Sequence, residues 1–219
     1  MKTTTALSLA AAMLLAAPRA YSDEDSGLTL GLRGVYGVPF GSAARGTDLD
    51  KLAAGTSPLQ VDVGYRFDRH WQAGGYFGYG FVRLADAANA ALAAQGAANV
   101  DGHRLMRLGL QGVYTILPEA RFAPWAGVSV GYEWLRYASA TVSGKESELG
   151  FRGFEAGVQV GADYRLGSSF RVGPFAAFNV GQFQSQMTWV SGAGETATDV
   201  AAKGVHEWLQ LGIEGSFNL

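Results

Sequence analysis

Apolar and other residues alternate along most of the chain with a repeat of two residues. The alternation runs through eight segments, at residues 28–40, 59–67, 71–81, 106–114, 122–134, 154–166, 170–180 and 209–219. In each segment, one set of alternate positions carries no charged residue and no His, Ser, Thr, Asn or Gln. Because successive side chains of a strand point to opposite faces, each segment predicts a strand with one apolar and one mixed face.

The composition of the two faces distinguishes a membrane barrel from a water-soluble sandwich or barrel. In a soluble fold, the apolar faces would pack inside and the charges would face water. Here large aromatic residues stand near the ends of the apolar faces, as in the aromatic girdles of a membrane barrel. Examples are Phe40, Phe67, Trp71, Trp134 and Phe217. The opposite faces are rich in glycine, which suits a crowded lumen.

The connections between the segments alternate in length. Residues 68–70, 116–121 and 167–169 form short turns, and residues 41–58, 82–101, 135–150 and 184–205 form long loops. This arrangement predicts an all-β protein, an eight-stranded antiparallel up-and-down transmembrane β-barrel. An even number of strands places both termini on the short-turn side, which is expected to be periplasmic.

Two of the long connections carry a structural signal of their own. The alanine-rich segment 84–99 predicts a short helix that caps the barrel mouth. The start of segment 184–205 is expected to prolong the seventh strand beyond the membrane and to pair with an extended eighth strand.

The first 22 residues read as a secretory signal peptide. Lys2 is followed by an apolar run over residues 6–17 and by small residues at Ala20 and Ser22. Such a run spans about 18 Å as a helix, which is short of the ~30 Å hydrocarbon core of a bilayer. We expect cleavage after Ser22, with cleavage after Ala20 as the alternative, and a barrel domain over residues 23–219.

The composition excludes several kinds of functional site. The 219 residues include no cysteine, which excludes disulfides, zinc–thiolate sites and cysteine catalysis. The formal net charge of −2 gives no indication of nucleic-acid binding.

The sequence resembles the small eight-stranded outer-membrane β-barrel family of the OmpA/OmpX/OmpW type. The resemblance covers residues 28–219 and rests on the alternation, on the turn Leu117-Pro118-Glu119-Ala120-Arg121 and on the closing strand 209–219. The last strand of the family usually ends in an aromatic residue that the barrel-assembly machinery reads, whereas this chain ends in Phe217-Asn218-Leu219. The resemblance implies an integral protein of the outer membrane of a Gram-negative cell.

An eight-stranded barrel has an interior just wide enough for side chains to fill. The charged residues expected to face inward include equal numbers of both signs, and unpaired charge in such a lumen would be costly. They are Arg33, Arg66, Arg107, Arg165, Arg171, Asp62, Glu133, Glu155, Asp163 and Glu214. Two interpretations stay open: a structural plug of ion pairs, or a narrow ion path lined by charge.

Other matches to chemical motifs are weaker. Residues 127–131 fit the pattern of a nucleophile elbow around Ser129, but that motif needs a sharp strand-to-helix turn and here the alternation continues. His70, His103 and His206 have no serine partner in the local sequence and are expected to be structural or solvated. The segment Asp48-Leu49-Asp50 offers too few oxygens to specify calcium. No catalytic residue, cofactor or metal is expected.

The sequence therefore favours a non-catalytic barrel that acts in envelope integrity or in surface interaction through its extracellular loops. The alternatives are a narrow channel for small hydrophobic or polar solutes, which the OmpW-type resemblance implies, and a lipid-modifying enzyme, which is less favoured. Expected partners are outer-membrane lipids and lipopolysaccharide, the barrel-assembly machinery and an extracellular partner of the loops, with no nucleic acid.

Basic residues near the outer rim are far apart in sequence. We expect them to meet lipid phosphates individually rather than as a cluster: Arg45, Lys51, Arg83, Arg104, Arg136, Lys145 and Lys203.

Overall fold

The computed structural model describes residues 26–94, 96–99, 102–141, 146–167 and 169–219. The signal peptide expected at residues 1–22 lies outside the described residues. Neither helix found in these ranges combines the length and the apolar composition that a membrane crossing requires.

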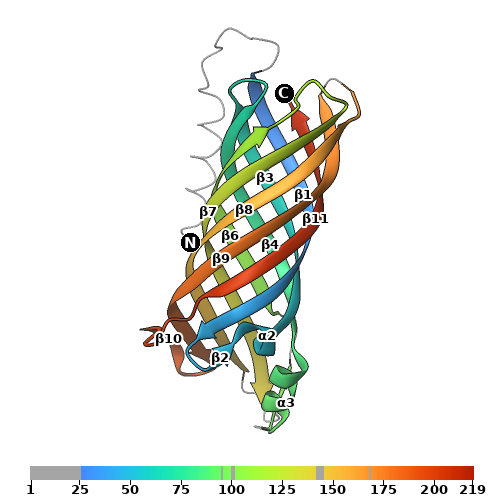
Figure 1. Cartoon of the computed structure of the whole chain (residues 1–219). Helices are drawn as coiled ribbons and strands as arrows, with labels where there is room; N and C mark the ends of the chain where they lie inside the picture. The colour runs from blue at the N-terminus through green and yellow to red at the C-terminus, as the bar shows by residue number, and fades with distance from the viewer. Residues whose placement is uncertain (1–25, 95, 100–101, 142–145, 168) are drawn as a thin grey trace.

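Eight long antiparallel strands form a closed ring (Figure 1). They are β1 (Gly27–Ala44), β3 (Ala53–Arg66), β4 (Trp71–Leu84), β6 (Arg104–Thr115), β7 (Phe122–Thr141), β8 (Glu146–Arg165), β9 (Phe170–Val190) and β11 (His206–Asn218). The last strand pairs with the first, from Thr29 opposite Asn218 to Gly41 opposite His206. Each long strand therefore has two neighbours, and the ring satisfies its own backbone hydrogen bonds. The predicted eight-stranded barrel is confirmed.

The two ends of the barrel differ in their connections. Turns at residues 67–70, 116–121 and 166–169 join the strands at the short-turn end, where β1 begins and β11 finishes. The other end, here the long-connection end, carries the remaining elements (Figure 1). They are β2 (Thr47–Asp48), α2 (Leu49–Leu52), α3 (Asp86–Ala94), β5 (Ala97–Asn99) and β10 (Gly194–Asp199).

Three of the predicted loops are largely regular structure. Strands β7 and β8 continue to Thr141 and from Glu146, so most of residues 135–150 is paired sheet. Strand β3 already begins at Ala53, before the predicted boundary. Residues 184–190 do prolong β9, but they pair with β8 and β10 and not with an extended last strand, because β11 starts only at His206. The helix predicted within residues 84–99 is confirmed as α3.

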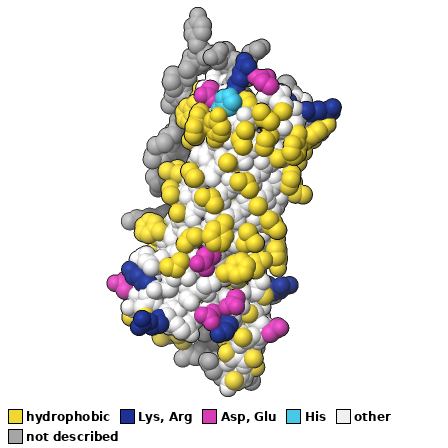
Figure 2. Space-filling model, viewed as in Figure 1, with side chains coloured by type: hydrophobic (Ala, Val, Ile, Leu, Met, Phe, Trp, Pro, Cys, Tyr) yellow, Lys and Arg dark blue, Asp and Glu magenta, His cyan; other side chains and the backbone are white. Residues whose placement is uncertain are grey.

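The alternation along the strands separates an apolar outer wall from a polar interior. In β1, Leu32 and Tyr36 are 52% and 46% exposed, whereas Arg33 between them is 5% exposed. Figure 2 shows hydrophobic side chains covering the middle of the barrel wall, with charged side chains mostly toward the two ends. Water would be an unfavourable solvent for such a wall, and the hydrocarbon of a bilayer is a favourable one.

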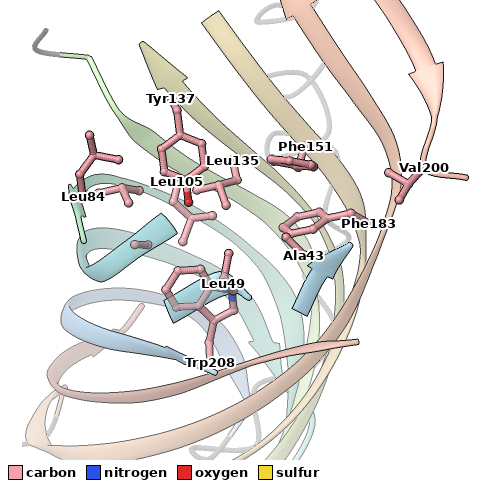
Figure 3. Close-up of a cluster of buried hydrophobic side chains, with 12 residues drawn as sticks. Ala43, Leu49, Leu84, Leu105, Leu135, Tyr137, Phe151, Phe183, Val200 and Trp208 are labelled. Carbon is pink, nitrogen blue, oxygen red and sulfur yellow. The ribbon is translucent and has the colours of Figure 1, made fainter. Parts of the chain in front are cut away.

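A cluster of buried apolar side chains fills the long-connection end of the interior (Figure 3). Leu49 of α2 inserts into it and is fully buried, as are Leu135 of β7 and Phe183 of β9. Leu92 of α3 packs against the cluster from outside. We call the set of buried residues the apolar plug; its members are Ala43, Leu49, Ala53, Val82, Leu84, Leu105, Leu135, Tyr137, Phe151, Phe183, Val200 and Trp208.

The turn between β3 and β4 is held by Asp68. Its carboxylate accepts hydrogen bonds from the backbone N–H groups of Trp71 and His70, at 2.8 and 2.7 Å. These bonds hold the pKa of Asp68 below its ordinary value, so the stability they contribute is present above the ordinary pKa and is lost as the pH falls through the lowered one.

We therefore expect Asp68→Ala to lower the unfolding temperature at neutral pH, and the difference from wild type to shrink in acid. Thermal unfolding followed by intrinsic fluorescence at several pH values measures both. Asp68→Asn is the matched control, because it keeps an acceptor oxygen and removes the titration. A wild-type advantage over Asp68→Ala that does not change with pH would contradict this assignment.

Candidate functional site in the barrel lumen

Arg33 of β1 organises the charged side chains nearer the short-turn end. Its Nε lies 2.6 Å from Oδ2 of Asp62 on β3 and 3.0 Å from Oε2 of Glu214 on β11. Its Nη1 donates to Oε1 of Gln159 on β8, at 2.6 Å, so the guanidinium joins walls that face each other across the lumen. The guanidinium also lies over the ring of Phe175, 4.9 Å from the ring centre.

Arg107 of β6 organises a second group nearer the long-connection end. Its Nη2 lies 3.3 Å from Oε2 of Glu155 and 3.6 Å from Oε2 of Glu133. The Tyr76 hydroxyl donates to the other oxygen of Glu155 at 3.2 Å. His206 Nε2 donates to Glu133, whose side chain is fully buried. One guanidinium and one imidazole thus face two buried carboxylates, next to the apolar plug on its short-turn side.

The remaining inward charges lie closer to the short-turn end of the barrel. The indole N–H of Trp125 donates to Asp163 at 3.0 Å, and Arg66 donates to Gln72 at 3.3 Å. Arg171 is buried as well. Arg165 differs, because it is only half-buried at the short-turn end, where its guanidinium donates to the backbone oxygen of Pro118.

The structure therefore places nine of the ten candidate residues in the buried interior, with exposures of at most 8%, and Arg165 at the rim. It brings together Arg33, Asp62 and Glu214 in one group and Arg107, Glu133 and Glu155 in another.

Sequence reasoning missed His206 as a member of the lumen. The imidazole is fully buried and stacks on Phe183 with ring centres 4.0 Å apart. The signal was present, since His206 and Trp208 continue the inward positions of Gln210 and Glu214 at a spacing of two residues. His103 is also buried, and its Nδ1 accepts the backbone N–H of Ala138 at 3.0 Å.

Two small cavities lie among the described polar side chains of the lumen. A cavity of ≈ 30 Å³ lies between Arg33, Asp62 and Trp125, and one of ≈ 20 Å³ lies between Arg107, Ser129 and Asn179. A single water needs about 10–15 Å³ of such space. The larger cavity therefore accommodates about two or three waters and the smaller one about one or two, and a hydrated ion does not fit in either.

The serine and aspartate motifs noted in the sequence do not form a catalytic or metal-binding site among the described residues. Ser129 lies in the middle of β7, where the strand continues on both sides without the turn of a nucleophile elbow. Asp48 is engaged by Lys51, 2.6 Å from its ammonium group, and this contact holds the pKa of the Asp48 carboxyl below its ordinary value. Among the described residues, no group of three or more His, Asp or Glu side chains is arranged to hold a metal ion.

Solved structures of other proteins share this architecture. Neisserial surface protein A matches with a TM-score of 0.55 at 12% identity, covering 89% of this chain and 99% of that one. OprG from Pseudomonas aeruginosa matches with a TM-score of 0.52 at 13% identity, covering 89% and 97%. A major outer membrane protein from Thermus thermophilus matches with a TM-score of 0.50 at 12% identity, covering 86% and 99%. At these identities the likeness shows the fold alone.

Comparison of the sequence itself gives the family. No curated protein matches the chain by sequence. A family model described as the outer membrane protein beta-barrel domain matches residues 7–180, which is most of the chain. The chain therefore belongs to the outer-membrane β-barrel family and is an integral protein of the bacterial outer membrane.

Proposed function

We propose that this protein is a non-catalytic outer-membrane barrel with a sealed lumen, which serves envelope integrity and surface contacts through its long-connection end. The observation that carries the proposal is the filling of the lumen. Charges of both signs pair across it, and the cavities between them measure only ≈ 30 and ≈ 20 Å³.

The apolar plug supports the same function. It lies across the long-connection end of the lumen, next to the group around Arg107. The guanidinium of Arg107 stands 5.5 Å from the centre of the Trp208 ring. Apolar constrictions exclude water and ions from narrow pores. A channel for polar solutes would need a continuous wet path through both the plug and the ion pairs beneath it.

The placement of the serine and histidine side chains also favours a non-catalytic role. Ser129 faces the lumen from mid-strand, His206 is bound to Glu133, and His70 stacks on Tyr114 with ring centres 5.3 Å apart. Hydrolytic chemistry would need a nucleophile next to a base at a surface that substrate reaches.

We place the short-turn end, with both termini, in the periplasm and the long-connection end outside the cell. Short turns on one side and longer connections on the other are the usual arrangement in outer-membrane barrels. In this orientation α3 and the fully exposed strand β10 present surfaces to an extracellular partner. The C-terminal end of β11 then faces the periplasm, the side from which we expect the barrel-assembly machinery to meet the chain.

Thiol accessibility tests the sealed lumen, because the chain has no cysteine of its own. Ser129→Cys places one thiol beside the ≈ 20 Å³ cavity, and Ser191→Cys places one in an exposed connection as the matched control. In the folded barrel, a charged thiol reagent is expected to label the control and to leave the lumen thiol unmodified until denaturant is added. Labelling of Ser129→Cys at the rate of the control would overturn the proposal.

A further inference from the structure

Four arginines stand at the same relative position on the outer wall. Each lies two residues beyond the end of the uninterrupted stripe of apolar side chains that faces outward on its strand, toward the long-connection end. The pairs are Phe81 and Arg83 on β4, Met106 and Arg104 on β6, Trp134 and Arg136 on β7, and Phe154 and Arg152 on β8. We call Arg83, Arg104, Arg136 and Arg152 the arginine row.

The row covers one side of the barrel only. Strands β4, β6, β7 and β8 are consecutive in the ring, so the four arginines stand on adjacent strands although they are far apart in sequence. Arg104 pairs directly with Arg136, whereas Arg83 and Arg152 are each offset by two residues from the neighbouring arginine of the row. The equivalent positions on β1, β3, β9 and β11 carry Ser42, Ser57, Gln182 and Glu207. Cations that served only to mark the edge of the lipid would have no reason to gather on one side.

The row is under-compensated by acidic side chains. Arg104 and Arg136 are direct cross-strand partners, an arrangement that costs stability when like charges face each other. They share one carboxylate, that of Glu148, at 3.6 and 3.3 Å, and all three side chains are 30–38% exposed. Arg83 is exposed and makes no ion pair within the described part of the chain, and Nε of Arg104 lacks a hydrogen-bond partner there.

The row stands at the level where a bilayer changes from hydrocarbon to headgroups. Next to the row, toward the middle of the barrel wall, Tyr132 contacts Trp134 and Phe154 edge-on, with ring centres 4.7 and 5.0 Å apart. Such aromatic clusters mark the interface of a membrane barrel. The arginines therefore face the headgroups of the leaflet at the long-connection end.

A hollow of ≈ 650 Å³ adjoins the row at Arg83 and is also lined by Tyr36, Ser57 and Phe81. Its volume falls in the range of pockets that hold drug-sized ligands. It provides room for a bulky headgroup beside the cation.

We propose that the arginine row binds the phosphate groups of lipid A, the phosphorylated glucosamine lipid of the outer leaflet. Guanidinium groups match phosphate oxygens with paired, charge-assisted hydrogen bonds, and phosphate supplies a second anion beside the single carboxylate that Arg104 and Arg136 share. The site rests on the orientation given under Proposed function, and it does not depend on whether the lumen is sealed.

Binding of bisphosphorylated lipid A to the refolded, detergent-solubilised protein tests the site, with native mass spectrometry as the measurement. The double variant Arg104→Gln/Arg136→Gln is expected to weaken binding by about tenfold or more, since two charge-assisted contacts are lost. Arg69→Gln/Arg121→Gln removes the same charge at the short-turn end and is expected to bind as wild type does. Dephosphorylated lipid A is expected to bind weakly to all of them.

Glu148→Gln makes the test independent of any folding defect in the double variant. Removing this carboxylate frees both arginines for phosphate, so lipid A is expected to bind several-fold more tightly than to wild type. Unchanged or weaker binding by a folded Glu148→Gln protein would overturn the site.

The remaining comparisons decide the ligand and the place. Wild-type affinity in the Arg104→Gln/Arg136→Gln variant, or equal binding of dephosphorylated lipid A, phosphatidylglycerol or inorganic phosphate, would overturn the proposal. Loss of binding in the Arg69→Gln/Arg121→Gln control alone would place lipid A at the other end and overturn the proposed orientation as well. None of these results alters the thiol-accessibility test of the sealed lumen.

Discussion

Replacing Arg107 with alanine is expected to destabilise the folded barrel by about 3–5 kcal/mol, the usual cost of removing one partner from a buried ion pair. Glu133 and Glu155 would lose the guanidinium that lies 3.6 and 3.3 Å from them, and both are almost completely buried. Unfolding in denaturant at constant lipid composition measures the loss. The same variant is expected to admit ions to the lumen if the carboxylates recruit water.

Two controls separate the charge network from a general effect of losing arginine. Arg165→Ala removes a half-buried guanidinium at the short-turn end and is expected to cost about 1 kcal/mol or less. Adding Glu155→Gln to Arg107→Ala is expected to restore part of the stability, because it removes the carboxylate that loses its ion-pair partner, while Glu133 keeps its hydrogen bond from His206. An Arg107→Ala barrel as stable as wild type would show that the network is not central to the fold.

Replacing Val128 with arginine is expected to cost about 2–4 kcal/mol, the penalty for arginine on the lipid face near the midplane of a bilayer. Val128 is 61% exposed, pairs with the equally outward Val158 of β8 and lies halfway between Phe122 and Trp134 on β7. Folding into lipid vesicles, followed by heat-modifiable gel migration, measures the effect on assembly, and denaturant unfolding measures the free energy.

The control for this second prediction places the same arginine side chain at a different depth in the bilayer. Ser57→Arg introduces the same side chain on the outer wall of β3, two residues beyond Leu59, at the level of the arginine row. Near the interface, arginine is expected to cost only about 0–1 kcal/mol. Equal costs for Val128→Arg and Ser57→Arg would contradict the placement of the lipid around the barrel.

The membrane-embedded part of the fold is readable from the sequence because lipid imposes a chemical rule on every second residue. Each outward position between the aromatic girdles must be apolar, and inward positions are free to be charged or glycine. Beyond the girdles that rule lapses. Residues 136–141 of β7 lie beyond the girdle, so the alternation loses its contrast there and the sequence alone predicts a loop instead of a strand.

The apolar plug was not predictable in the same way. Leu49 stands between Asp48 and Asp50, and the four-residue helix α2 is too short to show a helical period. Its burial is decided by tertiary packing against β-strand residues such as Leu135 and Phe183, which are far away in sequence.

The lumen charges were predictable as a set, because inward positions follow from parity along each strand. Which of them meet was not predictable. The pairing of Arg33 with Gln159, 126 residues away, depends on the stagger between strands, and a one-residue slip would point either side chain outward. The arginine row is a further case, since Arg83, Arg104, Arg136 and Arg152 look scattered until the strand register aligns them.

Single-channel recording of the refolded mature protein in a planar bilayer tests the sealed lumen most directly, once heat-modifiable migration has shown that the barrel is folded. The filled lumen and the apolar plug predict a folded barrel that produces no conductance steps. Reproducible steps that scale with ion concentration would contradict the sealed lumen and would make the groups around Arg33 and Arg107 the lining of a pore.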